Sequence, residues 1–269
     1  MRLLFVGGGN MGAAIVGGLV ARGFAPAGIT VVEPGEAARE SIARRFGVAV
    51  RAEAAGGSPA DVVVLAVKPQ QMRDAVKPLL PLADGTLVLS IAAGIRLADL
   101  SRWLGGHAAL VRAMPNTPAL VHAGVPGLYA PPAVDARGRA LAAELMAAVG
   151  EVVWLPREED LDAVTAVSGS GPAYVFYFIE AVEQAARELG LAPEAAGALA
   201  LGTFAGAAKL ARGRGEDPAV LRAQVTSRGG TTERALAAME AAGLKARVGE
   251  AVKAAAARSR ELGDEFGRD

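Results

Sequence analysis

A glycine-rich turn near the start of the chain most constrains its fold. An apolar run at residues 3–6 leads directly into Gly7-x-Gly9-x-x-Gly12, and a helical pattern follows over residues 10–21. In this spacing the first glycine allows a tight turn, the second lets the backbone approach a pyrophosphate, and the third lets helix and strand pack closely. The stretch therefore predicts a strand, a turn and a helix whose N-terminus binds a dinucleotide.

The same segment has a second interpretation as a secretory signal, because Met1-Arg2 precedes a mostly apolar stretch that reaches Ala21. Asn10 within the stretch, the glycines in motif phase and the lack of a clear small-residue cleavage site favour the dinucleotide site. Glu33 ends the next β-like run and agrees with the acidic residue of that motif. Its carboxylate could accept hydrogen bonds from a ribose 2′-hydroxyl and repel a 2′-phosphate, which favours NADH. A surface glutamate before a turn is the alternative.

Composition excludes several classes of function. The 269 residues carry a formal net charge of zero and show no basic run or stripe, so nucleic acid and acidic membrane surfaces are poor partners. There is no cysteine, which removes disulfides, thiolate nucleophiles and cysteine metal sites, and His107 and His122 do not have metal-site spacing. No apolar run is long enough for a transmembrane helix. We therefore expect a soluble, cytoplasmic protein with no metal and no membrane partner.

The first part of the chain alternates short runs rich in valine and leucine with longer helical patterns. The runs are residues 3–6, 29–32, 62–67, 86–89, 110–113 and 152–155. Such alternation predicts an α/β fold, a Rossmann-type doubly wound parallel sheet over residues 1–156. Ligands of such sheets bind beyond the carboxyl ends of the strands.

The residues that follow these runs are candidates for cofactor contact. Lys68, before Pro69, could face a phosphate or ribose, or extend into solvent. Small residues at 90–94 would let a flat ring lie against the backbone, or would reflect tight packing. Asn116, between two prolines, offers a donor and an acceptor to a nicotinamide amide or ribose, unless it only shapes a turn. These loops would all lie on one rim of the sheet.

Beyond residue 155 the β-like runs stop. Acidic residues at 158–160 suit a helix N-terminus, and the pattern to residue 269 predicts about five or six helices. We place a domain boundary near Pro156, with a helical substrate-binding and dimerisation domain over residues 157–269. Predicted helix breaks lie at residues 168–172, 190–193, 213–218, 228–230 and 243. Residues 173–182 are apolar on most faces and 198–211 are rich in small residues, so we expect a second copy of the chain to cover them.

The segment from Thr226 to Glu233 is the most informative part of the helical region. A glycine pair, Gly229-Gly230, leads into a helix with hydroxyl residues on both sides. Its exposed N–H groups would hold a small anion, most naturally a carboxylate. Ordinary capping of the helix is the alternative.

The few available proton-donating side chains limit the class of substrate that the chain could reduce. A carbonyl reductase normally needs a proton donor at the developing alkoxide, and the chain offers no cysteine, no metal site and no lysine beside the glycine-serine loop. A cyclic imine is less demanding, because its nitrogen can be protonated before hydride arrives. One hydroxyl hydrogen bond could then orient it.

The chain resembles a known family, the pyrroline-5-carboxylate reductases, over nearly its whole length. The resemblance lies in six blocks in the right order, residues 5–12, 66–70, 90–94, 112–118, 162–174 and 225–232. It implies NAD(P)H-dependent reduction of 1-pyrroline-5-carboxylate to L-proline, the last step of proline biosynthesis. It also implies a Rossmann domain and a helical domain that interlocks two subunits, with self-association to a dimer or to a decamer of dimers.

The resemblance also implies the site residues by position. Cofactor contacts are expected for Val6, Gly7, Gly8, Gly9, Asn10, Met11, Gly12, Val67, Lys68, Pro69, Ala92, Ala93 and Asn116, to which the residue pattern adds Glu33. The substrate carboxylate and ring would contact Ser227, Gly229, Gly230, Thr231 and Thr232, with Thr232 as the hydroxyl partner of the imine nitrogen and the catalytic residue. Arg228 departs from the proline usual in the family, and the choice between NADH and NADPH stays open.

Two other functions compete with this interpretation. A 3-hydroxyacid dehydrogenase has a similar two-domain plan, but it needs a catalytic lysine after the glycine loop of the helical domain, and Tyr174 and its neighbours provide none. A non-catalytic nucleotide sensor that dimerises through its helices would not depend on Thr232 for rate.

Overall fold

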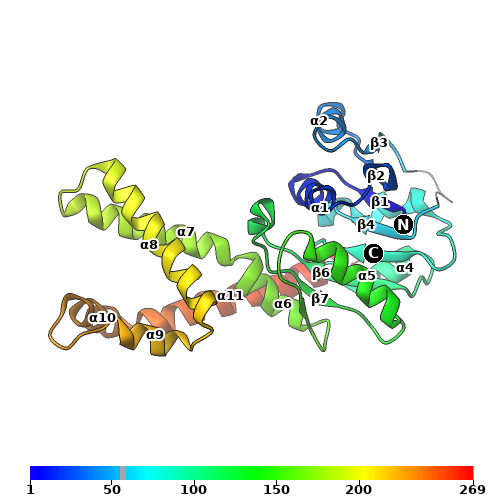
Figure 1. Cartoon of the computed structure of the whole chain (residues 1–269). Helices are drawn as coiled ribbons and strands as arrows, with labels where there is room; N and C mark the ends of the chain where they lie inside the picture. Colours follow the sequence, from blue (N-terminus) through cyan, green and yellow to red (C-terminus); the bar gives the residue numbers. More distant parts are fainter. Residues whose placement is uncertain (55–58, 269) are drawn as a thin grey trace. The chain divides into compact units, whose positions relative to one another are not determined.

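The chain forms two compact units. The structure is a computed structural model that describes residues 1–54 and 59–268. One unit, here called the sheet unit, comprises residues 1–170 and 255–269, and the other, the helical unit, comprises residues 171–254 (Figure 1). The boundary predicted near Pro156 marks the change from strands to helices. The compact units do not divide at that residue. The helical segment directly after it, up to residue 170, and the end of the last helix, from residue 255, belong to the same compact unit as the sheet.

A sheet in the order β3-β2-β1-β4-β5-β6-β7-β8 forms the centre of the sheet unit. Its strands are β1 (Leu3–Val6), β2 (Ile29–Val32), β3 (Ala49–Arg51), β4 (Val62–Leu65), β5 (Leu87–Ser90), β6 (Leu110–Met114), β7 (Gly127–Tyr129) and β8 (Val153–Trp154). The doubly wound α/β fold is thus confirmed, with six runs close to their predicted positions. Two short strands, β3 and β7, were not predicted, and the sheet is not wholly parallel because β7 runs antiparallel to β6.

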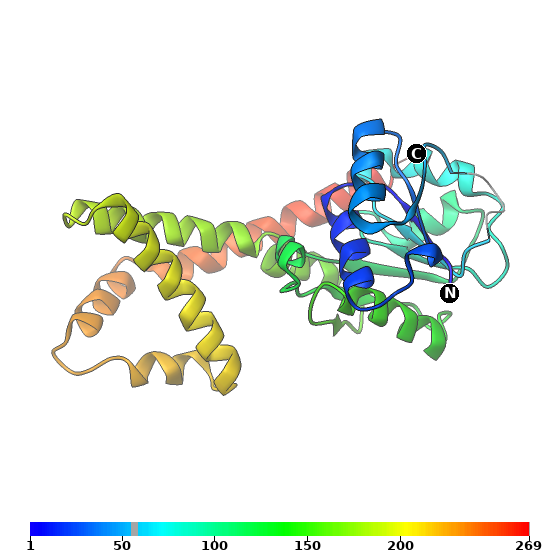
Figure 2. The same ribbon diagram turned by 45° about the horizontal axis from the view of Figure 1, so that its top comes forward.

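Both faces of this sheet are covered, which explains why its strands are continuous apolar runs. Leu3 and Phe5 of β1 belong to a buried cluster with Ile15 of helix α1, whereas Leu4 and Val6 point to the other face, in a cluster with Met72 of α3. The helices of the unit are α1 (Asn10–Ala21), α2 (Glu36–Phe46), α3 (Met72–Val76), α4 (Leu97–Trp103), α5 (Ala136–Ala147) and α6 (Asp160–Val164). Figure 2 shows α1 and α2, in blue, side by side.

A π-helical turn shortens one predicted break to a bend at Ser170. Residues 165–169 follow α6 without interruption as a π turn, in which Ser170 N–H donates to the Thr165 carbonyl over 2.8 Å, and α7 begins at Gly171. The Ser168 hydroxyl donates to the Val125 carbonyl over 2.9 Å, which fixes the turn to the loop before β7. The break predicted at residues 168–172 is therefore present but shorter than expected, because the π turn continues to Gly169 and only a bend at Ser170 separates it from α7.

The other predicted breaks agree with the observed helix ends. The remaining helices are α7 (Gly171–Glu188), α8 (Pro193–Arg214), α9 (Pro218–Gln224), α10 (Thr231–Ala241) and α11 (Leu244–Phe266). Among the described residues no helix has the length and apolar character needed to cross a membrane.

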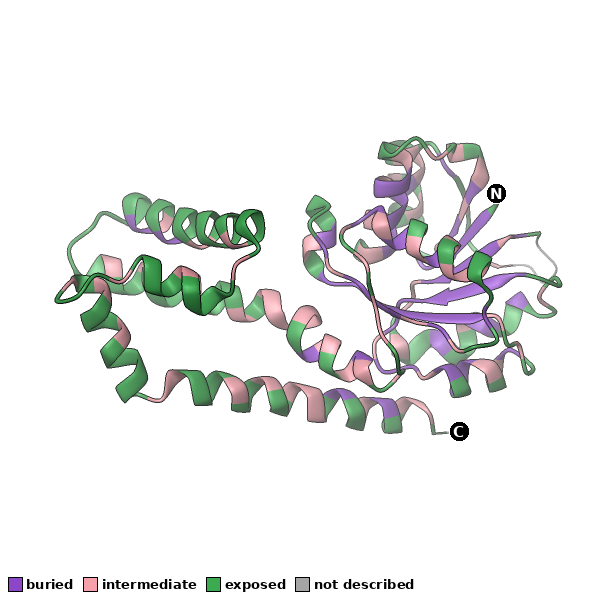
Figure 3. Cartoon of the chain, turned by 60° about the horizontal axis from the view of Figure 1, so that its bottom comes forward, coloured by how far each residue is buried: buried purple, intermediate pink, exposed green. Residues whose placement is uncertain are grey.

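Apolar side chains of the helical unit are largely exposed within one chain. Helix α7 contains no buried residue, and Phe176 and Tyr177 are 65% and 70% exposed. Figure 3 shows this contrast, with buried residues concentrated in the strands and exposed residues on most of the helical unit. Large exposed apolar side chains on consecutive residues of α7 indicate an interaction with another protein surface.

The end of α11 returns to the sheet unit. Arg96, next to α4, forms an ion pair with Asp264 at 2.6 Å, and the Ser259 hydroxyl donates to the Asp162 carboxylate over 2.6 Å. The Phe266 ring packs against Gly94, so closely that a Cβ added to Gly94 would lie only 3.0 Å from the ring. Helix α11 therefore belongs to both compact units.

Candidate active site

A cavity of about 670 Å³ opens at the carboxyl ends of β1, β2 and β4. Parallel pairing brings Val6 level with Val32 and with Leu65, so the loops after these three strands lie on one rim. Five residues predicted from the sequence line the cavity together: Gly7, Gly9, Glu33, Val67 and Lys68.

The glycine turn has the geometry that a dinucleotide requires. Gly7 has a φ of +105°, and a Cβ there would lie 2.7 Å from the Ala66 carbonyl group. A Cβ on Gly12 would lie 2.6 Å from the Gly7 carbonyl oxygen, so the third glycine allows the helix to approach the turn. At Gly9 a Cβ would meet no protein atom within 4 Å. The space above Gly9 is therefore open to a ligand.

The N-terminus of α1 is ready to bind an anion. Gly9 is its N-cap and provides no side-chain hydrogen bond, and the first turn contains no acidic residue. The unpaired N–H groups and the helix dipole therefore favour a phosphate group there. These features fit the diphosphate of NAD(P)H, with Asn10 and Met11 at the start of the helix.

Replacing Gly9 by alanine is expected to leave stability unchanged and to weaken dinucleotide binding roughly fivefold to a hundredfold, as a methyl group forced into a close contact does. The N-cap conformation of Gly9, with φ of −64°, suits alanine, and the space around it is free. Thermal unfolding and titration with NADH and NADPH measure the two effects. Unchanged binding would show that no ligand approaches the backbone at Gly9.

Glu33 is bound to the glycine turn itself. Its Oε2 accepts the Gly8 N–H over 2.9 Å, and its Oε1 accepts the Gly35 N–H over 2.9 Å. The sequence placed Glu33 at the rim but did not show this contact. A Cβ on Gly8 would lie 2.3 Å from Ile42 Cδ1, so the end of the Ile42 side chain would have to shift to admit one.

The other predicted cofactor residues follow the neighbouring strands. Lys68 is exposed and precedes the short 3₁₀ helix that begins at Pro69. Ala92 and Ala93 follow β5, and Ala92 is buried. Asn116 is also buried, and its Oδ1 accepts the Val125 N–H over 3.0 Å. One lone pair of Oδ1 is therefore used within the protein, while the amide N–H groups remain available to donate to a cofactor.

The predicted substrate segment in the helical unit begins with a tight turn. Gly229 has a φ of +75°, its N–H donates to Glu233 Oε2 over 2.7 Å, and the Gly230 N–H donates to the Ser227 carbonyl over 3.1 Å. Both glycine N–H groups thus have partners. Helix α10 starts at Thr231 without a side-chain cap, so its first N–H groups, those of Thr231 and Thr232, are the ones open to an anion.

The two histidines are bound to backbone carbonyl groups. His107 Nε2 lies 2.8 Å from the Thr86 oxygen and His122 Nδ1 lies 3.2 Å from the Ala148 oxygen. These contacts explain both residues as parts of loops and give neither a role in chemistry.

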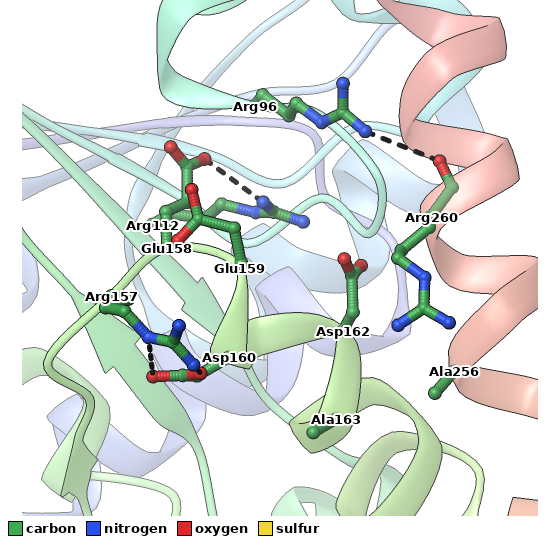
Figure 4. A pocket seen from close by; sticks show the side chains of 10 residues that line it. All are labelled: Arg96, Arg112, Arg157, Glu158, Glu159, Asp160, Asp162, Ala163, Ala256 and Arg260. Carbon is green, nitrogen blue, oxygen red and sulfur yellow. Dashed lines mark hydrogen bonds and ion pairs between the residues drawn. The ribbon is translucent and has the colours of Figure 1, made fainter. Parts of the chain in front are cut away.

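Sequence reasoning missed a second cavity, of about 570 Å³, between β6, α6 and the end of α11. Arg112 on β6 is only 5% exposed and forms an ion pair with Glu158 at 3.1 Å, and Glu158 also accepts the Leu97 N–H over 2.8 Å. Figure 4 shows arginine and acidic side chains alternating around it. The lining carries four arginines and four acidic residues, so its formal charges balance. The signal for it is an arginine inside an otherwise apolar strand.

Comparisons with known proteins identify the family. A profile described as pyrroline-5-carboxylate reductase dimerisation matches residues 158–262, and one described as NADP oxidoreductase, coenzyme F420-dependent, matches residues 2–94. A pyrroline-5-carboxylate reductase of Pseudomonas aeruginosa is 46% identical over 269 residues, covering 99% of this chain and 98% of the relative. The chain belongs to the pyrroline-5-carboxylate reductase family.

Solved structures agree with this assignment. A pyrroline-5-carboxylate reductase from Coxiella burnetii superimposes with a TM-score of 0.91 at 41% identity, covering 97% of this chain and 98% of that chain. A Plasmodium falciparum pyrroline carboxylate reductase, solved with NADP bound, has a TM-score of 0.85 at 27% identity, with 98% of each chain covered. The resemblance seen in the sequence is confirmed. As a pyrroline-5-carboxylate reductase, the chain is an NAD(P)-dependent oxidoreductase of proline biosynthesis that self-associates through its dimerisation region.

Proposed function

We propose that this chain reduces 1-pyrroline-5-carboxylate to L-proline by transferring a hydride from NADH or NADPH to a protonated cyclic imine. Family membership supports the reaction. The observation that supports the mechanism is a pair of uncapped helix N-termini, at α1 beside the glycine turn and at α10 beside Thr232. One suits a diphosphate and the other suits a carboxylate.

In this proposal the cofactor is held by the loops after β1, β2, β4, β5 and β6. The open N–H groups at the start of α1 bind the diphosphate, and Lys68 lies close enough to the cavity to neutralise phosphate charge. The bound nicotinamide supplies the hydride. Asn116, with its oxygen already bound to Val125, donates its amide N–H groups to the cofactor.

The substrate is held by the start of α10. The N–H groups of Thr231 and Thr232 bind the carboxylate, while the turn from Ser227 to Gly230 fixes their direction. The Thr232 hydroxyl accepts a hydrogen bond from the protonated imine nitrogen and so orients the C=N bond. Hydride adds to the imine carbon, its electron pair forms the new C–H bond, and the π electrons become the nitrogen lone pair of proline.

The assay that tests this proposal follows NAD(P)H absorbance with the purified protein. Oxidation is expected only when 1-pyrroline-5-carboxylate is added, with proline formed in equal amount. No turnover with either cofactor would contradict the proposed reaction.

The proposal extends to assembly and location. The exposed apolar residues of α7 support a dimer through the helical region. A decamer of dimers is proposed as the larger form, and the cytoplasm as the location. Sedimentation velocity on the purified protein measures the size. A monomer at micromolar concentration would contradict the proposed dimer.

A further inference from the structure

We propose that Glu33 makes this chain select NADH over NADPH. This inference rests on the proposed function, because it requires the cavity beside the glycine turn to be the dinucleotide site. It concerns only which of the two dinucleotides is preferred, and it differs from what the Plasmodium falciparum relative solved with NADP bound would suggest.

The Glu33 carboxylate is held in place at the cavity. It directly follows β2, lines the cavity, and is only partly exposed. One oxygen accepts the Gly8 N–H and the other accepts the Gly35 N–H, each over 2.9 Å. Hydrogen bonds from N–H groups to a carboxylate are strengthened by its charge, so the ionised group stays at this position.

This position is where a dinucleotide fold places the adenosine ribose. The acidic residue at the end of the second strand accepts a hydrogen bond from the ribose 2′-hydroxyl. Each carboxylate oxygen can accept more than one hydrogen bond, so Glu33 can bind a hydroxyl while its two backbone contacts persist. NADPH carries a phosphate on the same 2′-oxygen, and two negative groups at close range repel each other.

The positive groups nearby do not offset Glu33. Arg39 is the candidate partner for a 2′-phosphate, but its Nη1 is held by the carbonyl oxygens of Glu33 and Pro34, each over 2.9 Å, and Arg39 does not line the cavity. Arg51 accepts the Glu33 N–H with its carbonyl but does not line the cavity. The charged side chains of the lining are Glu33, Asp74 and Lys68, which sum to one net negative charge.

Binding measured without substrate tests the inference. The purified protein is titrated separately with NADH and NADPH, followed by cofactor fluorescence, and the two dissociation constants are compared. We expect NADH to bind roughly tenfold more tightly. The Glu33→Ser variant should bind NADPH at least as tightly as NADH, because it loses the charge and leaves room for the phosphate.

A matched control removes a charge nearby. Glu36 is exposed at the start of α2 and does not line the cavity, so Glu36→Gln should keep the wild-type preference. Circular dichroism checks that each variant is folded. If Glu33→Ser does not fold, the ratio of the NADH and NADPH dissociation constants of the wild type still tests whether NADH is preferred.

Each outcome has a separate meaning. Equal or tighter binding of NADPH by the wild type, or a preference that Glu33→Ser leaves unchanged, would overturn the role of Glu33. A protein that binds neither dinucleotide contradicts the dinucleotide site itself, and with it the proposed function. Tighter NADH binding that is lost in Glu33→Ser and kept in Glu36→Gln supports the inference.

Discussion

The Thr232→Ala variant is expected to lose roughly tenfold to a thousandfold in kcat, the range for removal of an orienting or proton-handling group. The hydroxyl orients the imine nitrogen in the proposed mechanism, whereas the dinucleotide cavity lies in the other compact unit. NADH and NADPH should therefore bind the variant as they bind the wild type. Steady-state rates with 1-pyrroline-5-carboxylate, and cofactor titrations without it, measure the two effects.

Two further variants separate the hydroxyl from the shape of the side chain. Thr232→Ser keeps the hydroxyl and should retain most of the rate. Thr232→Val keeps the branched shape without the hydroxyl and should behave like Thr232→Ala. A Thr232→Ala variant with wild-type kcat would remove the hydroxyl from the mechanism. A protein that acts only as a nucleotide sensor would instead turn over no substrate, with or without the substitution.

The Arg112→Met variant is expected to lose about 3 to 4 kcal/mol of stability, the lower part of the range for breaking a buried ion pair. Arg112 is buried on β6, and its partner Glu158 is about four-fifths buried, with its side chain 20% exposed. Methionine fills similar space but leaves the Glu158 carboxylate with the Leu97 N–H as its remaining partner. Thermal and urea unfolding of the purified variant measure the loss.

The double variant Arg112→Met with Glu158→Gln is the control for charge. Glutamine removes the unpaired charge and can still accept the Leu97 N–H, so most of the lost stability should return. If the double variant is as unstable as Arg112→Met alone, the loss comes from packing around β6 and not from the stranded carboxylate.

The sequence was most informative where one local pattern determines the structure. Helix α1 begins and ends at the predicted residues because the glycine turn and the following apolar periodicity define it. The strands β3 and β7 were missed because they are short and carry weak patterns: Ala49–Arg51 is exposed at both ends, and Gly127–Tyr129 includes a glycine. Antiparallel pairing of β7 depends on β6 and cannot be seen within three residues.

Contacts between distant side chains and backbone groups were beyond the sequence pattern. The glycine turn and Glu33 were both singled out, yet the hydrogen bond that joins Gly8 to Glu33 spans 25 residues. The turn before α10 was expected to offer its glycine N–H groups to an anion, and the structure shows that Glu233 takes the one from Gly229. Such pairings depend on the folded path of the chain.

The division of α11 between the two compact units has a consequence for synthesis on the ribosome. The sheet unit contains residues 255–269, which are translated only after the whole helical unit has been made. Domains made first generally fold first, but here the pairing of Arg96 with Asp264 and the packing of Phe266 beside Gly94 must wait until the last helix emerges. A nascent chain therefore leaves the surface around α4 uncovered until residues 255–266 have left the ribosome.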